Sequence, residues 1–352
     1  MPQPDKEFNN IKVHTQFSIC EGAVKIDELA NYCKTNKIKA IGIADSYNLC
    51  GALEFAEKIS KAGTQPIIGT QINIKYDNQI GKITLYATSE QGYKNLTKLS
   101  SLSYLKDKTS NEPYCDIEDL TSHNLDLILL TGNYNDFFGK LFSSNKLKLI
   151  QKLLSLLSTT FGNRLYLEIQ RHGESFEINY ENFLLKASSQ LNIPIIAGQE
   201  VYYINPDMAE AHDALICIGQ KQFVDDRNRF RYNDQHYLKK DKELIKLYQD
   251  IPEALENNYN FPKKFSFKPK HTKPVLPSLN LGKNKTAEQE LLTQAQLGLN
   301  KRFKNFILPK NSEKDQKKLE ELYKDRLNHE INIINSMNFN IKVILKRFIQ
   351  IL

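Results

Sequence analysis

The side chains best suited to chemistry in this sequence lie at the ends of apolar runs. The stretch Gln170-Arg171-His172-Gly173-Glu174 follows one such run and combines an imidazole with a carboxylate, as general acid–base catalysis requires. The same residue types also form structural hydrogen-bond networks, and we favour that interpretation here. His212 lies in a segment with helical periodicity and is likewise interpreted as structural. The phosphate-binding patterns Gly-x-Gly-x-x-Gly and Walker A do not occur.

The cysteines and the hydropathy pattern argue against several classes of protein. Five cysteines, at positions 20, 33, 50, 115 and 217, are scattered and form no Cys-x-x-Cys pair. We therefore expect reduced thiols in a cytoplasmic protein, in preference to disulfides or a zinc site. No window approaches the roughly 18 apolar residues of a membrane helix. The residues after Met1 are polar and acidic, so we expect no secretory signal.

The positive charge of the chain is concentrated in one segment. The net charge is +7, and seven lysines with no acidic residue lie between Lys263 and Lys285. Pro269, Pro274 and Pro277 interrupt the same stretch, so it is predicted to be extended. We favour a solvated linker. The alternative is a contact with nucleic-acid phosphates, which salt would weaken.

The elements that would position these side chains alternate over the first 200 residues. Apolar runs predict strands at Ile11–His14, Ala40–Asp45, Pro66–Ile74, Ile83–Ala87, Leu127–Thr131, Leu165–Ile169 and Pro194–Ala197. Helical periodicity lies between most of them, at Ile26–Thr35, Ala52–Lys61, Leu147–Leu157 and Glu181–Gln190. Strands separated by helices indicate a parallel sheet. Seven strands favour a barrel, with any chemistry at the C-terminal ends of its strands.

Beyond residue 200 this alternation ends. A helix is predicted over Ala209–Ile218 and an irregular segment over Asp225–His236. Thr286 and Gln289 form a capping-box pattern at the start of another helix. A last helix is predicted from Ser312 towards Met337, and we expect its apolar stripe to pack within its own domain in preference to a partner. The stripe consists of Leu319, Leu322, Tyr323, Leu327, Ile331 and Ile334.

A series of short strings adds a family resemblance. The strings are Val13-His14-Thr15-Gln16-Phe17-Ser18, Glu21-Gly22-Ala23, Ile43-Ala44-Asp45, Asn48-Leu49-Cys50-Gly51, Pro66-Ile67-Ile68-Gly69, Gly92-Tyr93-Lys94-Asn95-Leu96, Leu167-Glu168-Ile169-Gln170, Ala211-His212 and Asp250-Ile251-Pro252-Glu253-Ala254-Leu255. In this order and spacing they resemble the N-terminal part of the bacterial DNA polymerase III alpha subunits. The similarity covers residues 9 to 339.

The resemblance implies an α/β fold built on a polymerase-and-histidinol-phosphatase (PHP) domain, a distorted (βα)7 barrel. We expect residues 1–260 to form this barrel with its C-terminal extension. Residues 261–285 would be a linker rich in lysine and proline. Residues 286–352 would be the mainly helical start of the thumb and palm region, truncated before the polymerase active site.

In metal-binding PHP domains, histidines and carboxylates hold two or three metal ions that activate water for phosphoester hydrolysis. The matching positions here are Asn10, Lys12, Glu21, Ser46, Gln71, Lys82, Asn133, Glu200 and Tyr202. Only Glu21 and Glu200 keep an acid. A lysine about 4 Å from a unit charge costs about 4 kcal/mol at an effective dielectric of about 20, and roughly double beside a divalent ion. We therefore expect no metal at these degenerate positions.

The polymerase chemistry of the family is also missing. Family members hold Mg²⁺ with an Asp-x-Asp pair downstream of a Gly-rich segment, and neither pattern occurs in this sequence. The chain follows the family as far as Phe339 and then diverges. We therefore expect no catalytic residues and no cofactor in this chain, although the family as a whole is a DNA-directed DNA polymerase, a nucleotidyltransferase.

The resemblance implies a cytoplasmic component of DNA replication that acts by binding. The expected partners are the proofreading exonuclease (epsilon) subunit and other replicase subunits, with DNA contact weak at best and no membrane contact. Two alternatives stay open: a stand-alone PHP phosphoesterase, against which the missing ligands argue, and a non-functional remnant of a split gene.

Overall fold

The computed structural model describes residues 7–105, 112–272, 286–310, 313–340 and 343. The chain divides into two compact units, residues 1–271 and 272–352. The two units are described separately below, and the expected lysine-rich segment falls largely on residues 273–285, outside the described residues.

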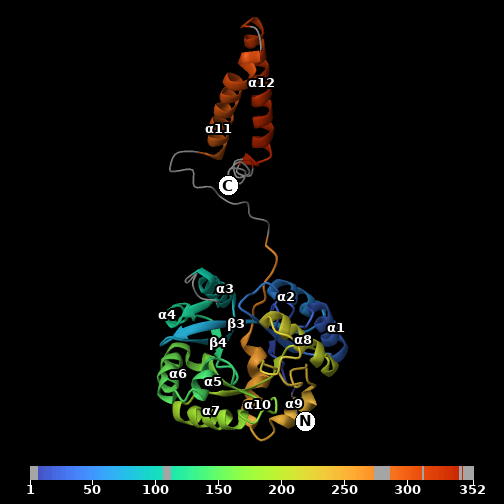
Figure 1. Ribbon diagram of the computed structural model, residues 1–352, viewed down its shortest axis with the longest axis vertical. Helices are drawn as coiled ribbons and strands as arrows, with labels where there is room; N and C mark the ends of the chain where they lie inside the picture. Colours follow the sequence, from blue (N-terminus) through green and yellow to red (C-terminus); the bar gives the residue numbers. More distant parts are fainter. Residues whose placement is uncertain (1–6, 106–111, 273–285, 311–312, 341–342, 344–352) are drawn as a thin grey trace. The chain divides into compact units, whose positions relative to one another are not determined.

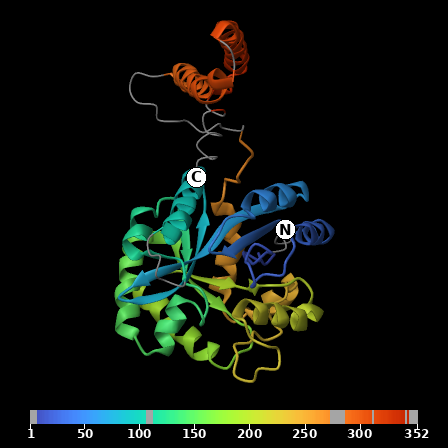
Figure 2. The same ribbon diagram turned by 45° about the horizontal axis from the view of Figure 1, so that its top comes forward.

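The first unit is built around one sheet that closes on itself. Its strands are β1 (Lys12–Val13), β2 (Ala40–Ser46), β3 (Gln65–Tyr76), β4 (Gln79–Ala87), β5 (Tyr114–Asp116), β6 (Leu127–Leu130), β7 (Leu165–Gln170), β8 (Ile195–Gly198) and β9 (Glu200–Val201). They lie side by side in the order β8-β7-β6-β4-β3-β2-β1-β9, with β5 paired to β3. Only Gln199 separates β8 from β9, so this segment joins the two ends of the sheet into a barrel (Figure 2). The expected α/β barrel is confirmed.

One strand runs against the predicted direction. β4 is antiparallel to both of its neighbours, β3 and β6, so the expectation of a wholly parallel sheet is wrong at this strand. Asp77 and Asn78 alone connect β3 to β4, and both have positive φ, 49° and 57°. A two-residue turn with positive φ at both positions is the type I′ hairpin, which reverses the chain.

Helices surround the barrel of the first unit, and the last two helices described, α11 and α12, belong to the second unit (Figure 1). They are α1 (Ile26–Asn36), α2 (Ala52–Lys61), α3 (Glu90–Leu105), α4 (Ile117–Ser122), α5 (Phe137–Ser143), α6 (Leu147–Phe161), α7 (Glu177–Leu191), α8 (Ala209–Gln220), α9 (Asp241–Leu247), α10 (Pro252–Asn260), α11 (Ala287–Arg302) and α12 (Glu313–Ser336). Among the helices that the structure describes, none has the length and apolar character needed to cross a membrane.

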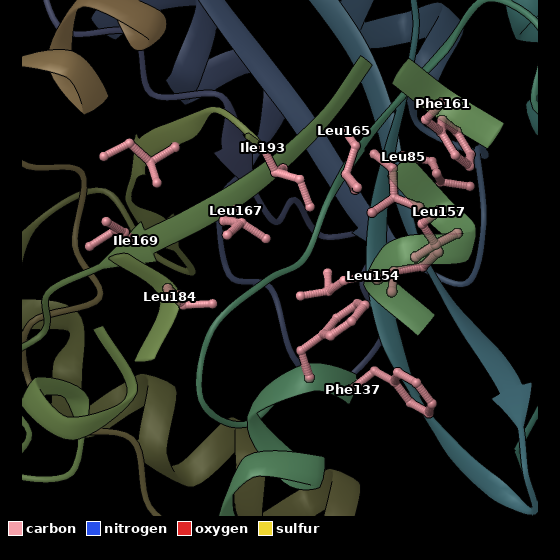
Figure 3. Packing of buried hydrophobic residues seen from close by; sticks show 14 of the residues in the cluster. Leu85, Phe137, Leu154, Leu157, Phe161, Leu165, Leu167, Ile169, Leu184 and Ile193 are labelled. Carbon is pink, nitrogen blue, oxygen red and sulfur yellow. The ribbon is translucent and has the colours of Figure 1, made fainter. Parts of the chain in front are cut away.

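Strand alternation sorts the side chains of the barrel into two sets. In β7, Leu165, Leu167 and Ile169 belong to the core between the sheet and the helices, where they pack near Leu154 and Leu184 of α6 and α7 (Figure 3). The intervening residues of β7, Tyr166, Glu168 and Gln170, face the barrel interior instead, because successive side chains of a strand point to opposite faces. Each fully buried aliphatic side chain stabilises the fold by about 1.5–3 kcal/mol.

An apolar plug fills the interior at the end where β2 and β3 begin. Phe261 is fully buried and meets the rings of Tyr86 and Tyr166 edge-on, with centroids 5.5 and 6.1 Å apart. Phe265 packs against the same cluster. Residues 261–271 therefore belong to the barrel unit, and the linker predicted for residues 261–285 was placed too early in the chain. Because this stretch is rich in proline and lysine, Phe261 and Phe265 were not predicted to be core residues.

The second unit is a pair of helices. Thr286 caps α11 through the predicted capping box with Gln289. The stripe of α12 packs within this unit at Ile331, which is buried, and Tyr323 meets Phe303 edge-on at 5.4 Å. Leu322 of the same stripe remains 63% exposed.

The plug generates a first prediction. In a chain shortened to residues 1–271, Phe261→Ala should lower the free energy of unfolding by about 3–5 kcal/mol, because it empties space inside the barrel. Phe223 provides the control, since its side chain is 79% exposed, and Phe223→Ala should change that free energy by less than about 0.5 kcal/mol. Urea unfolding followed by circular dichroism measures both, and equal losses would contradict the role given to Phe261.

Candidate functional site

The polar end of the barrel interior contains a buried lysine. Lys12 of β1 has no solvent exposure, and its Nζ lies 3.2 Å from Asp136 Oδ2, 3.4 Å from Glu168 Oε2 and 3.4 Å from Glu200 Oε1. The three carboxylates come from the N-terminal cap of α5, from β7 and from β9. One ammonium group thus connects three separate parts of the barrel wall.

Glu200 receives the largest share of the remaining hydrogen bonds. Its Oε1 accepts from Gln71 Nε2 at 3.0 Å and lies 3.0 Å from His14 Nε2. Its Oε2 accepts from Asn133 Nδ2. Lys12, Gln71, Asn133 and Glu200, four of the positions that match metal ligands of the family, therefore lie in direct contact around Glu200.

Burial and ion pairing oppose each other in this cluster. Burial lowers the pKa of Lys12, but the three carboxylates together raise it well above its ordinary value. Burial raises the pKa of Glu200, but Lys12 and His14 hold that pKa well below its usual range. For Asp136 and Glu168 burial outweighs the attraction of Lys12, and their pKa values are raised. Lys12 and Glu200 are consequently the charged centre of the cluster.

A second lysine occupies a neighbouring position. Lys82 of β4 lies 2.8 Å from Glu21 Oε1 and 3.3 Å from Ser46 Oγ. Ser46 Oγ donates to the other oxygen of Glu21, and its contact with Gln71 Oε1 at 3.4 Å connects this cluster with the first. Burial lowers the pKa of Lys82, but Glu21 raises it above its usual value.

These contacts decide what chemistry Ser46 supports. A serine nucleophile needs a neighbouring base that accepts its proton. Lys82 is held protonated by Glu21, so it cannot accept that proton. Burial raises the pKa of Glu21, but Lys82 lowers it below its usual value, so Glu21 is a weak base. The Ser46–Lys82 pair is therefore an ion-pair network and not a nucleophilic dyad.

Aromatic rings cover the mouth above both clusters. The Tyr202 ring stacks on His14 at 4.5 Å, and its hydroxyl lies 3.1 Å from that of Tyr232. His212 is buried and its Nε2 lies 2.8 Å from the Glu21 carbonyl oxygen, which agrees with the structural role predicted for it. A cavity of about 350 Å³ remains at the mouth, lined by both Lys82 and Glu200.

The polar strand end at residues 170–174 also forms structural contacts. Gln170 Nε2 donates to Glu168 at 2.7 Å, and Arg171 forms ion pairs with Glu181 at 2.6 Å and Asp250 at 2.7 Å. His172 Nδ1 lies 3.3 Å from Glu177 Oε1. The predicted structural network is present here, and both ion pairs of Arg171 are part of it.

The donor set does not fit the metal ions of metal-binding PHP domains. Among the described residues, no group of three or more histidine, cysteine, aspartate or glutamate side chains is arranged to hold a metal ion. The ammonium groups of Lys12 and Lys82 already form ion pairs with the four carboxylates at this end of the barrel. A divalent ion would have to displace the ammonium group of Lys12, which is buried away from solvent. Otherwise it would have to bind beside that group against direct electrostatic repulsion. No reaction step through a metal follows from this site.

Sequence reasoning missed two members of the site. It counted Glu21 and Glu200 as the remaining acids, whereas Asp136 and Glu168 also face Lys12. Glu168 could have been identified from its place in the strand Leu-Tyr-Leu-Glu-Ile-Gln, because the alternation of the strand puts this charged side chain on the face that points into the barrel. Asn10 lies buried, and its side-chain oxygen is without a hydrogen-bond partner in the described part of the chain.

Known proteins resemble this chain over most of its length. A PHP domain is found over residues 10–172. DNA polymerase III subunit alpha of Caulobacter vibrioides is 33% identical over 340 residues, which cover 94% of this chain and 29% of that protein. The subunit of Rickettsia conorii is 34% identical over 339 residues, and that of Vibrio cholerae 29% identical over 351. The chain therefore contains a PHP domain and is similar along nearly its whole length to DNA polymerase III alpha subunits.

The match has clear bounds. The chain spans 28% to 30% of the length of these relatives. A solved two-domain protein from Bacteroides vulgatus, described as containing a predicted PHP-like metal-dependent phosphoesterase, aligns with a TM-score of 0.38 at 11% identity, over 70% of this chain and 64% of that one.

The ion cluster of this PHP domain yields a stability prediction. Lys12→Met should lower the free energy of unfolding by about 3–5 kcal/mol at pH 7.5, because it leaves buried carboxylates without their cation. The loss should narrow towards pH 5, since without Lys12 the pKa values of Asp136 and Glu168 rise further and protonation removes the repulsion. Lys98→Met on the exposed face of α3 is the matched control, expected to be near neutral.

Metal content gives an independent prediction for the same PHP domain. Protein purified without chelators should hold less than one equivalent of zinc, manganese or iron per chain, because Lys12 and Lys82 occupy the cation positions. Inductively coupled plasma mass spectrometry measures the content. Stoichiometric metal that disappears in Glu200→Ala would overturn the assignment.

Proposed function

We propose that this chain is a non-catalytic PHP scaffold of the replicative DNA polymerase and that it acts by binding other replicase subunits. The proofreading exonuclease (epsilon) subunit is its first expected partner, and the cytoplasm its compartment. The observation that carries the non-catalytic part of the proposal is the burial of Lys12 among three carboxylates.

The similarity to DNA polymerase III alpha subunits supports the role in replication. Relatives named DNA polymerase III subunit alpha align with 94% to 98% of this chain. The polymerization chemistry of those proteins needs carboxylates that grip Mg²⁺. The Asp-x-Asp pair that the family uses for this purpose is absent from the sequence, so synthesis is not part of the function proposed for this chain.

The integrity of the barrel supports the role as a scaffold. The three apolar clusters lie inside the sheet and between the sheet and its helices, and the ion clusters pair the carboxylates of the polar end with lysines without a metal. A rigid barrel with helices on its outside offers surfaces that do not depend on chemistry at its mouth. The competing role as a stand-alone phosphoesterase would require an activated water, for which the site has no metal ligands in a fitting arrangement.

Binding of the exonuclease subunit tests this proposal. The full chain and a chain of residues 1–271 should each form a one-to-one complex with the purified exonuclease subunit of the same organism, because the barrel unit contains its own core. Size-exclusion chromatography with light scattering measures the stoichiometry. A peptide of residues 286–340 serves as the control and should not bind.

Two outcomes would contradict the proposal. Absence of a complex with either chain at micromolar concentrations would remove the scaffold role. Release of phosphate from a phosphoester substrate at a rate abolished by Glu200→Ala would favour the phosphoesterase alternative.

A further inference from the structure

Two lysines of the described residues are buried, and their surroundings differ. Lys12 has three carboxylate partners within 3.4 Å. Lys239 is 3% exposed, and no carboxylate of the described residues forms an ion pair with it. A buried ammonium without a counter-ion is strongly disfavoured, so the two amines should differ in protonation.

The contacts of Lys239 are those of a weakly held amine. Its Nζ donates to the backbone carbonyl of Gln235 and lies 4.4 Å from the centroid of the Tyr237 ring. Burial lowers the pKa of Lys239 to about 8, and the attraction of Glu243, Asp234 and Glu177 only partly offsets it. These are the charged groups that face Lys239 from α9, from its own segment and from α7.

The amine of Lys239 also lines a cleft that is open to solvent. Lys239 lines an open cleft of about 690 Å³ between α9 and the loop that follows β7. Lys246 lies on the same cleft, is exposed, and supplies a cation for an anionic ligand. The cleft is separate from the ion clusters at the mouth of the barrel, whose residues do not line it.

We propose that Lys239 is a modification site, acylated by small acyl phosphates that enter this cleft. The phosphate group of the reagent would be attracted by Lys246, which places the acyl carbon near Lys239. The neutral amine attacks the acyl carbon, the bond from that carbon to the phosphate oxygen breaks, and the amine proton leaves with the phosphate. The products are an amide on Lys239 and inorganic phosphate.

Acylation would act on the segment that covers the barrel. Residues 235–238 are bound to the barrel by backbone contacts, including Tyr202 N–H to the His236 carbonyl at 2.9 Å and Leu238 N–H to the Tyr203 carbonyl at 3.0 Å. Gln199 Nε2 also donates to the Gln235 carbonyl at 3.1 Å, the same oxygen that Lys239 contacts. Loss of the charge of Lys239 removes its attraction to the Tyr237 ring, and the segment loosens.

The first experiment measures relative reactivity in the intact chain. The protein is treated with acetyl phosphate, and site occupancy is followed by peptide mass spectrometry at pH 7 and pH 10. With a pKa of about 8 roughly a tenth of Lys239 is neutral at pH 7, against about one in 2,500 for an ordinary lysine. Lys239 should therefore be acetylated at least about fivefold faster than the matched control Lys246 at pH 7, with the ratio falling at pH 10. Equal rates, or faster reaction of Lys246 at pH 7, would overturn the proposal.

The second experiment measures the effect on the covering segment. Lys239→Gln, which mimics the acylated side chain, should accelerate amide hydrogen exchange over residues 233–240, whereas Lys239→Arg and Lys246→Gln should not. Unchanged exchange in Lys239→Gln would refute the loosening, and acceleration in Lys246→Gln would show that it does not depend on Lys239.

Discussion

Neutralisation of charge inside a closed barrel is the constraint on which this structure depends. The sheet closes through the segment that contains β8 and β9, so side chains on its inner face, such as Lys12, are enclosed by the barrel wall. An ammonium placed there needs acidic partners from the surrounding wall. Lys12 obtains them from α5, β7 and β9 at 3.2 to 3.4 Å, and the polar end of the barrel is organised around that group.

This arrangement separates the fold from the chemistry that PHP domains support elsewhere. A metal ion polarises water and lowers its pKa, whereas an ammonium group has neither an open coordination position nor that Lewis acidity. Lys12 and Lys82 therefore supply positive charge without supplying a reaction. Because both are covalently part of the chain, the carboxylates at the mouth have cationic partners without any supply of metal. This arrangement supports the scaffold role proposed for the barrel.

The sequence predicted the barrel well where periodicity was strong. The apolar runs at residues 40–45, 66–74 and 165–169 all became strands within one or two residues of the expected ends. The direction of β4 was missed because Asp77 and Asn78 form a tight turn without glycine. Asp136 was missed because it belongs to none of the family strings. Glu168 belongs to one of them but was not among the positions matched to metal ligands, and both side chains meet Lys12 only after the chain folds. Phe261 was assigned to a linker because its neighbours are proline and lysine, although its ring fills the barrel.

The comparison of Lys12 with Lys239 shows why sequence alone could not assign the chemistry of either. Both side chains are identical and both are buried, so composition and hydropathy treat them alike. Three carboxylates around the first raise its pKa, whereas the second has only a carbonyl and an aromatic ring beside it, and burial lowers its pKa. The distinction arises from residues that are distant in the chain, such as Glu168 and Glu200 for Lys12. Reactivity in this protein is therefore decided by which acids the fold brings to a lysine, and the barrel mouth, where acids are most plentiful, is the place where lysine is least reactive.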